Sequence, residues 1–158
     1  MSVARKSVSV ARKRVEKELR DVWTNPIEGI VAGPVDESNM MAWTATIDGP
    51  SGTPYEGGKF KLSMNFPSNF PFKPPQCKFL TKVYHCNVSS RGSICLDILK
   101  SEWSPVLTVN KLLLSIMTLL SDANPSDPLS AEVADMYLSN RAEHDRIAAH
   151  WTEMYAKT

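Results

Sequence analysis

Hydrophobic residues in the first part of the chain recur at the spacing of an amphipathic helix. Over residues 9–23, apolar positions three and four residues apart form one face, and basic residues occupy much of the remaining surface. The predicted apolar face consists of Val15, Leu19, Val22 and Trp23. Asn25-Pro26 follows directly, and because the residue before a proline disfavours helical backbone, we expect the helix to end there.

Residues 30–80 show a different pattern, in which hydrophobic and polar residues alternate as in half-buried strands. Four strands are expected, at residues 30–32, 41–47, 60–66 and 76–80. Gly33-Pro34 is expected to break the first one. Short connections and clean alternation favour an antiparallel sheet with one covered face. Cys77 shares its register with Phe79, so we expect it in the core.

Two stretches lack such periodicity. Residues 66–75 contain four prolines, which exclude regular structure and stiffen the loop. Residues 81–107 contain no long periodic segment, and we expect irregular structure there with a short helical turn at residues 96–99. Because loops held by a rigid scaffold often carry function, this second stretch is the first place to look for chemistry.

The last third of the chain returns to helical spacing. A strong helix capped by Thr108 is predicted at residues 109–120, and a further helix covers about residues 130–138. Asn140 and Glu143 form a capping pair for a last helix. Its expected inner face consists of Ile147, Trp151, Met154 and Tyr155, whereas His144 and His150 are expected on the surface. The order of elements predicts an α+β domain.

Length and composition fit one ordered domain. The chain has 158 residues, 42% of them hydrophobic, with a net charge of +1, which argues against a disordered chain. Residues 1–23 hold seven Lys or Arg and three Asp or Glu, whereas the remaining residues hold eleven and fourteen. This basic end fits contact with nucleic acid, an anionic membrane or an acidic protein surface, and it fits a solvated helix face equally well. The overall charge balance argues against a dedicated nucleic-acid binder. We assign residues 1–8 to a flexible basic tail and 9–158 to the folded domain.

Cysteine use points to a reducing compartment. Cys77, Cys86 and Cys95 are an odd number without a disulfide-dense pattern, and no CxxC pair favours a structural zinc site. The amino end has no apolar segment of signal-peptide length, and no apolar run approaches a membrane span. We therefore expect a cytoplasmic or nuclear protein with no membrane partner, and no metal or organic cofactor.

The candidate chemistry is concentrated in His85, Asn87 and Cys95, which lie within eleven positions. A cysteine is a strong nucleophile near neutral pH, and an asparagine amide is a good fixed donor for a developing oxyanion. That combination favours acyl transfer through sulfur. The alternative is a structural cysteine, because Cys95 lies between Ile94 and Leu96 as a core cysteine would.

The longer motif identifies a family. Tyr84-His85-Cys86-Asn87, Cys95 in Gly-Ser-Ile-Cys-Leu-Asp-Ile-Leu, and then Trp103-Ser-Pro resemble the active-site segment of ubiquitin-conjugating enzymes. The resemblance extends from about Arg12 to Tyr155 and is greatest to the small class that has little beyond the catalytic domain. It implies an N-terminal helix, a four-stranded antiparallel sheet, a central helix and two C-terminal helices.

The resemblance also implies roles for site residues. Cys95 is the position that carries ubiquitin as a thioester before a substrate lysine takes it. Asp127 matches the acidic residue that orients that lysine and favours its neutral form, although a turn-stabilising Asp before Pro128 explains it equally well. Asn87 matches the asparagine that stabilises the oxyanion or its loop, and His85 matches a histidine that supports the loop. Leu96 and Asp97 match family positions that help to hold the carboxyl-terminal tail of the ubiquitin carried on the cysteine.

Partner surfaces follow from the same resemblance. Arg14 and Lys17 match positions that engage the ubiquitin-activating enzyme, with ordinary exposed charge as the alternative. Phe72 and the segment Ser104, Pro105 and Val106 match the two loops that meet RING-type ligases. The implied partners are thus ubiquitin, its activating enzyme, RING-type ligases and protein substrates, while ATP belongs to the upstream enzyme.

Two positions depart from the family pattern. Cys86 stands where the family has a proline, which restores a backbone N–H, frees φ and places a second thiol beside the motif. Whether Cys86 can pair with Cys95 depends on their geometry. Val31 stands where close relatives have a serine that supports non-covalent ubiquitin binding, so processive chain assembly is not inferred.

Three other functions compete with ubiquitin transfer. One is a weakly active or inactive scaffold of the same fold, although Cys95, Asn87 and Asp127 are retained. Another is a carrier of a different ubiquitin-like modifier, although the short 96–104 segment lacks the insertion of the SUMO-conjugating branch. A papain-like hydrolase is a further alternative, but its sequence context is missing.

Overall fold

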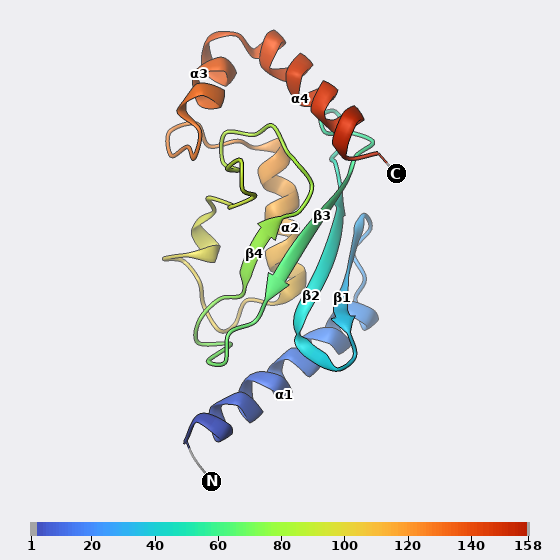
Figure 1. Ribbon diagram of the computed structural model, residues 1–158, viewed down its shortest axis with the longest axis vertical. Coiled ribbons are helices and arrows are strands. Elements are labelled where there is room, and N and C mark those ends of the chain that lie inside the picture. Colours follow the sequence, from blue (N-terminus) through green and yellow to red (C-terminus); the bar gives the residue numbers. More distant parts are fainter. Residues whose placement is uncertain (1–2, 158) are drawn as a thin grey trace.

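The computed structural model describes residues 3–157, with side chains from residue 10 onward. Four helices, four strands and a 3-10 turn follow one another (Figure 1). They are α1 Val3–Thr24, β1 Ile30–Asp36, β2 Asn39–Asp48, β3 Lys59–Asn65, β4 Gln76–Phe79, η1 Asp97–Leu99, α2 Val109–Ser121, α3 Ala131–Ser139 and α4 Arg141–Tyr155. The α+β fold expected from the sequence is confirmed. Within the described part, no helix combines the length and hydrophobicity needed to cross a membrane.

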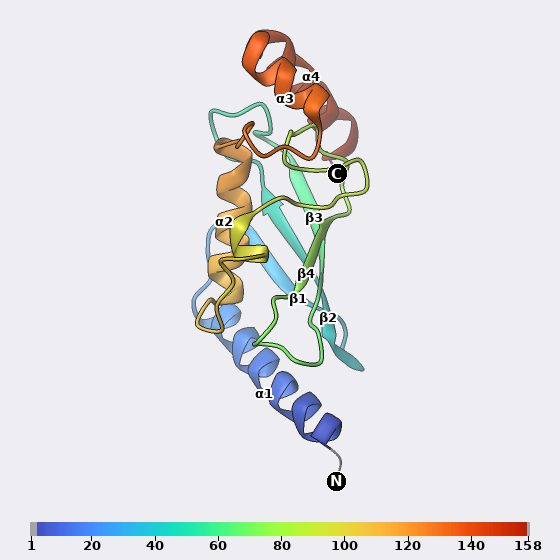
Figure 2. The same ribbon diagram turned by 90° about the vertical axis from the view of Figure 1, so that its left-hand side faces the viewer.

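The sheet is antiparallel in the order β1-β2-β3-β4. Its register places Ala45 of β2 opposite Ala32 on one side and Leu62 on the other, so alternate side chains from neighbouring strands share one face. That face is buried, and α2 lies against it (Figure 2). Cys77 faces inward beside Met64 on β3, as the alternation predicted.

The ends of two elements differ from the sequence expectation. Gly33-Pro34 does not break the first strand, because both residues pair with β2 and a register shift follows before Asp36. An edge strand tolerates proline since one side of its ladder has no partner to lose. Helix α1 begins at Val3, so residues 3–8 of the predicted tail are helical, while residues 1 and 2 lie outside the described part.

Helix α1 buries a narrower stripe than predicted. Val15, Leu19 and Val22 are buried as expected, but Trp23 is 69% exposed. Successive helical residues are turned by about 100° about the axis, and Trp23 lies beyond the edge of the buried stripe. The stripe instead includes Glu18, whose side chain is almost completely buried.

Buried Glu18 joins α1 to the start of α2. One carboxylate oxygen accepts a bond from the Val109 N–H at 2.7 Å, and the other accepts one from Arg14 Nε at 2.9 Å. The first N–H groups of a helix have no partner within the helix, and the helix dipole favours negative charge there. Thr108 caps the same helix by accepting from the Lys111 N–H. The predicted cap is therefore confirmed, and the glutamate was not foreseen.

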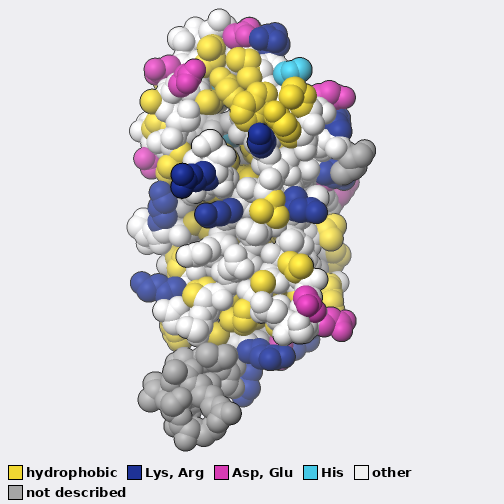
Figure 3. All heavy atoms as spheres, in the orientation of Figure 1, with side chains coloured by type: hydrophobic (Ala, Val, Ile, Leu, Met, Phe, Trp, Pro, Cys, Tyr) yellow, Lys and Arg dark blue, Asp and Glu magenta, His cyan; other side chains and the backbone are white. Residues whose placement is uncertain are grey.

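Helices α3 and α4 form one end of the molecule, where hydrophobic side chains gather on the surface (Figure 3). The predicted inner face of α4 is wrong in part, since Met154 and Tyr155 are exposed and Ile147 and Trp151 are only partly buried. The residues of α4 that are buried are His144, Ala148 and Thr152.

The histidine was misassigned because its burial depends on rings brought from elsewhere in the chain. Tyr84 lies 5.3 Å from the His144 ring and Tyr137 lies 5.1 Å away, both between ring centroids, while Nδ1 lies 2.8 Å from Asp145 Oδ1. His150 is exposed, as expected. The expected Asn140 cap is also present, since its Oδ1 accepts from the Glu143 N–H at 3.2 Å.

Candidate active site

The segment between β4 and α2 is irregular, but backbone bonds fix it firmly. Val88 and Ile94 form an antiparallel bridge, and the Cys95 N–H donates to the Asn87 carbonyl at 2.9 Å. Upstream, the Tyr55 hydroxyl donates to the Tyr84 carbonyl at 2.6 Å. Asn87 and Cys95, eight positions apart in the sequence, are thereby held side by side.

A glycine sets the approach of this segment to the sheet. Gly92 has a φ of +87°, and a Cβ there would lie only 2.1 Å from the Phe79 carbonyl oxygen. The Phe79 N–H donates to the Gly92 carbonyl at 2.9 Å. Only glycine combines that backbone conformation with so close a contact. Gly92 therefore holds the strand-like run before Cys95 against β4.

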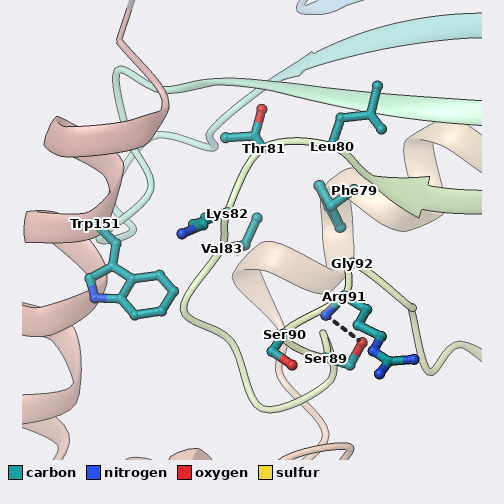
Figure 4. Close-up of a pocket in the computed structure, with 10 residues that line it drawn as sticks. All are labelled: Phe79, Leu80, Thr81, Lys82, Val83, Ser89, Ser90, Arg91, Gly92 and Trp151. Atoms are coloured by element: carbon teal, nitrogen blue, oxygen red, sulfur yellow. Dashed lines mark hydrogen bonds between the residues drawn. The ribbon is translucent and has the colours of Figure 1, made fainter.

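A pocket of about 300 Å³ lies on the other side of this turn, between residues 79–83, residues 89–92 and Trp151 (Figure 4). A bond from the Arg91 N–H to Ser89 Oγ, drawn as a dashed line, closes the turn at 3.2 Å. None of the predicted catalytic residues lines this pocket. The candidate site is therefore a surface segment around Cys95 and not the pocket.

Asn87 is completely buried and its side chain is used in full. Its Nδ2 donates to the backbone carbonyls of Asn124 at 2.9 Å and Asp127 at 3.1 Å. Its Oδ1 accepts from the Asn124 N–H at 2.8 Å. Both amide hydrogens are thus committed to the loop between α2 and α3. In this conformation the amide positions the loop that carries Asp127, and it has no free donor for an oxyanion.

His85 is buried behind Asn87 with both ring nitrogens bonded. Nδ1 accepts from the Asn87 N–H at 3.0 Å, which leaves Nε2 as the donor to the Leu119 carbonyl at 2.8 Å. Burial lowers the pKa of His85 to about 4, although the bond to Leu119 opposes that shift. The ring is therefore neutral, and both of its nitrogens are engaged in hydrogen bonds. This fits a role in supporting the loop around Asn87 and not a role in proton transfer.

Cys95 lies next to two charged side chains. Its Sγ is 3.4 Å from Asp127 Oδ2 and 3.4 Å from Lys100 Nζ, and both of those residues are exposed. Although Cys95 itself is only 9% exposed, it does not belong to the cluster of buried residues that forms the hydrophobic core. The sulfur thus lies at a polar edge of the fold, in contact with two exposed charged side chains.

The two residues beside the sulfur differ in how far the sequence foretold them. Asp127 was predicted, and the loop held by Asn87 brings it to Cys95. Lys100 was not identified from the sequence. In the sequence, Lys100 is marked only by its position five residues after Cys95, across the predicted turn at residues 96–99. The two side chains come into contact only when that turn is folded.

Cys86, which stands at the family's proline position, is buried and bonded within the same network. Its Sγ lies 3.4 Å from Asn87 Oδ1, and its carbonyl accepts from the N–H groups of Leu129 and Ser130. Burial raises the pKa of the Cys86 thiol. All three cysteines are present as free thiols. Cys86 therefore fills a structural position beside the candidate nucleophile Cys95.

Two loops are predicted to meet a ligase. One is the proline-rich loop at residues 66–75, and the other is the end of the irregular segment, at residues 104–106. Trp103 Nε1 donates to the Pro71 carbonyl at 2.9 Å, which joins the proline-rich loop to the segment that begins at Ser104. Phe72 is 68% exposed and Val106 is 82% exposed. Pro105 is also exposed, and Ser104 is half-buried. The four predicted residues thus belong to two loops that are tied together.

The two predicted contacts of the activating enzyme differ from each other. Lys17 is exposed on α1. The Arg14 side chain is only 19% exposed, bonds Glu18, and donates to the Leu107 carbonyl at 3.2 Å. Its guanidinium also lies 5.8 Å from the centre of the Phe70 ring. Arg14 therefore has a packing role that links α1 to the loops near α2.

Comparison with known proteins agrees with this geometry. The family model described as "Ubiquitin-conjugating enzyme" matches residues 14–152. The match includes Cys95, Asn87, Asp127 and most of every element except α1, and it covers most of the chain. Within the described residues, no group of three or more His, Cys, Asp or Glu side chains is arranged to hold a metal ion. The chain belongs to the ubiquitin-conjugating enzyme family.

Proposed function

We propose that this protein accepts ubiquitin as a thioester on Cys95 and passes it to substrate lysines, usually together with a RING-type ligase. The observation that carries the proposal is the sulfur of Cys95, which lies outside the hydrophobic core with the Asp127 carboxylate 3.4 Å away. Family membership supports the same class of reaction.

The first step charges the enzyme. The Cys95 thiolate attacks the thioester carbonyl between ubiquitin and the activating enzyme, a new C–S bond forms, and the activating enzyme's sulfur leaves. A thioester retains the activation for transfer to an amine, so a difficult acyl transfer is divided into two easier ones. A depression of about 340 Å³ beside Leu96, Asp97 and Ile98 is our candidate for the donor tail.

The second step transfers the acyl group. A neutral substrate amine attacks the thioester carbonyl, the C–S bond breaks, and the isopeptide bond forms. An unperturbed lysine titrates near ~10.4, so an acceptor needs help to lose its proton. Asp127 is our candidate to orient that amine and receive the proton. We assign Asn87 and His85 to positioning, since Asn87 holds the Asp127 loop and His85 bonds the Asn87 backbone.

Partner contacts remain part of the proposal. Lys17 is the more accessible of the two basic residues for the activating enzyme, because Arg14 is already bonded within the fold. Exposed Phe72 and Val106 offer apolar contact to a ligase from two loops joined by Trp103. A bulky valine at position 106 would influence which ligase binds.

A charging assay tests the proposal. The protein is incubated with activating enzyme, ATP and ubiquitin, in parallel with other ubiquitin-like modifiers and their own activating enzymes. We expect a reductant-sensitive adduct with ubiquitin, absent from Cys95→Ala and retained in the matched control Cys77→Ala. A scaffold would form no adduct. A carrier of another modifier would be charged by that modifier in preference to ubiquitin.

A further inference from the structure

Basic side chains from the middle of the sequence gather on one face of the molecule. Seven Lys and Arg occur between residues 21 and 110, and each of them lines one of three neighbouring depressions. The eight Asp and Glu of the same stretch line none of the three. Figure 3 shows Lys and Arg side chains in a band across the face of the sheet turned away from α2, with Asp and Glu nearer its margins. Positive and negative charges are therefore separated on this surface.

Two of the depressions lie next to each other along β4 and the chain that follows it. The first, of about 570 Å³, is lined by Lys73, Lys78 and Lys100. The second is the pocket of about 300 Å³ in Figure 4, and it is lined by Lys82 and Arg91. An extended chain that follows β4 would thus pass from one group of cations to the next.

The third depression continues the same series. Consecutive residues of the 76–83 segment line the first depression and then the second. The third, of about 380 Å³, shares residues 80–82 with the second and adds Lys59, Lys61 and Lys157. We call this continuous surface the basic path, and the eight cations named for the three depressions define it.

Most cations of the basic path have no acidic partner within the described part of the chain. Lys59 bonds to Asp48 at 2.6 Å, and Lys157 lies 3.8 Å from Glu153. None of the other six forms an ion pair with a described carboxylate, and all eight residues are exposed. Neighbouring like charges repel one another, and a negatively charged partner relieves that repulsion.

We propose that the basic path binds an extended acidic segment of a partner protein, rich in Asp and Glu. The charge balance favours a short segment over a nucleic acid, because a net charge of only +1 requires the remaining residues to sum to a negative charge. Fields from exposed charges are screened over about 8 Å at physiological ionic strength. A segment within the path therefore meets its cations, whereas a longer polyanion would extend over the acidic margins.

The basic path connects the candidate nucleophile with the end of α4. At one end, Lys100 Nζ lies 3.4 Å from Cys95 Sγ. At the other, Lys82 Nζ lies 5.1 Å from the centre of the exposed Tyr155 ring, which lines the third depression. A partner held along the path would lie beside Cys95, but its binding requires no transfer through that cysteine.

Fluorescence anisotropy with labelled peptides tests the proposal on the full chain. The probe is a short peptide in which Asp and Glu alternate with Ser and Gly, and its control has Asn and Gln in place of the acids. We expect the acidic peptide to bind, with an affinity that falls as salt is added, and the neutral peptide not to bind. The largest amide shifts in NMR spectra should occur at residues of the basic path. Absence of binding, or equal binding of the neutral peptide, overturns the proposal.

Reversing one charge in each depression tests the path itself. The variant combines Lys61→Glu, Lys78→Glu and Arg91→Glu, and its affinity for the acidic peptide should fall at least about tenfold. Urea unfolding checks that the variant is folded. If it is not, glutamine at the same three positions removes the charge without reversing it, and this variant should still weaken binding about threefold or more.

A matched variant separates the local charge from the net charge. Lys13→Glu, Arg20→Glu and Lys111→Glu reverse three exposed cations outside the path, and the affinity should change by less than about twofold. Equal weakening in both triple variants would mean that net charge governs binding, which overturns the proposal. Tighter binding of duplex DNA of equal charge, or of vesicles that contain phosphatidylserine, would also overturn it and would assign the path to nucleic acid or to a membrane.

Discussion

Two cysteines in this molecule are equally hidden from solvent but have opposite surroundings. Cys77 on β4 is 8% exposed and belongs to the hydrophobic core, whereas Cys95 is 9% exposed and contacts Asp127 and Lys100. Burial raises the pKa of the Cys77 thiol to about 12. Exposure alone therefore does not distinguish an inert thiol from a candidate nucleophile, and the polar neighbours of the sulfur do.

Selective alkylation should separate the two thiols most strongly. At pH 8 a thiol with a pKa of about 12 is ionised to only roughly 10⁻⁴, so Cys77 should react on the order of a thousandfold more slowly than an ordinary accessible thiol. We expect iodoacetamide to modify Cys95 first, as followed by peptide mass spectrometry over time. In urea the three cysteines should react at similar rates. Equal rates in the folded protein would remove the distinction.

The polar surroundings of Cys95 depend on Asn87, which holds the loop that carries Asp127. Removing the Asn87 amide should therefore make the surroundings of Cys95 more like the apolar surroundings of Cys77. Asn87→Ala leaves backbone groups of Asn124 and Asp127 without partners. We expect the free energy of unfolding in urea to fall by about 3 kcal/mol. Transfer from charged enzyme to free lysine should slow by on the order of a hundredfold, because Asp127 is no longer held at the sulfur.

The two readouts distinguish the roles considered for Asn87. A residue that only donates to the oxyanion would slow transfer and leave stability nearly unchanged. Asn65→Ala is a matched control, since Asn65 is exposed on the outer face of β3. It should change neither measurement by more than a few tenths of a kcal/mol.

The sequence predicts those features of the Cys77 and Cys95 regions that depend on residues close together in the chain, and it does not predict those that depend on distant residues. The period-two alternation placed Cys77 and Phe79 inward, because a strand's facing is set by its nearest neighbours. Family motifs identified Cys95, Asn87 and Asp127 as candidates. The buried Glu18 and the ring contacts of His144 join segments far apart in the chain, and no local pattern signals them.

His85 lies behind the Cys95 region, and its titration should weaken that region without affecting the sheet core. Its pKa is about 4 when folded, against about 6.5 in an unfolded chain, so the unfolded chain binds more protons between these values. The contribution of neutral His85 is fully present above pH 6.5 and is lost as the pH falls toward 4. It amounts to about 3 kcal/mol at most.

Urea unfolding from pH 7.5 to 4 measures this effect. Carboxylates also titrate toward the acid end, so the comparison is made between variants. His85→Gln cannot titrate, and its stability should depend less on pH than that of the wild type between 6.5 and 4. His150→Gln changes an exposed histidine and should retain the wild-type slope. Parallel slopes for His85→Gln and wild type would show that His85 is protonated equally in both states.

The smallest effect expected within the Cys95 region comes from Cys86, where the family has a proline. Cys86→Pro keeps the carbonyl that accepts from Leu129 and Ser130, and no hydrogen bond from the Cys86 N–H is recorded within the described residues. A proline compatible with the native backbone stabilises mainly by restricting the unfolded chain, by roughly 0.4–1 kcal/mol. The weak thiol contact to Asn87 is lost in the exchange. We therefore expect a change in unfolding free energy below about 1 kcal/mol, with Cys86→Ala as the control that removes the thiol alone. A loss of several kcal/mol in the proline variant alone would mean that this loop has a backbone conformation that proline cannot adopt, and that Cys86 is an adaptation to it.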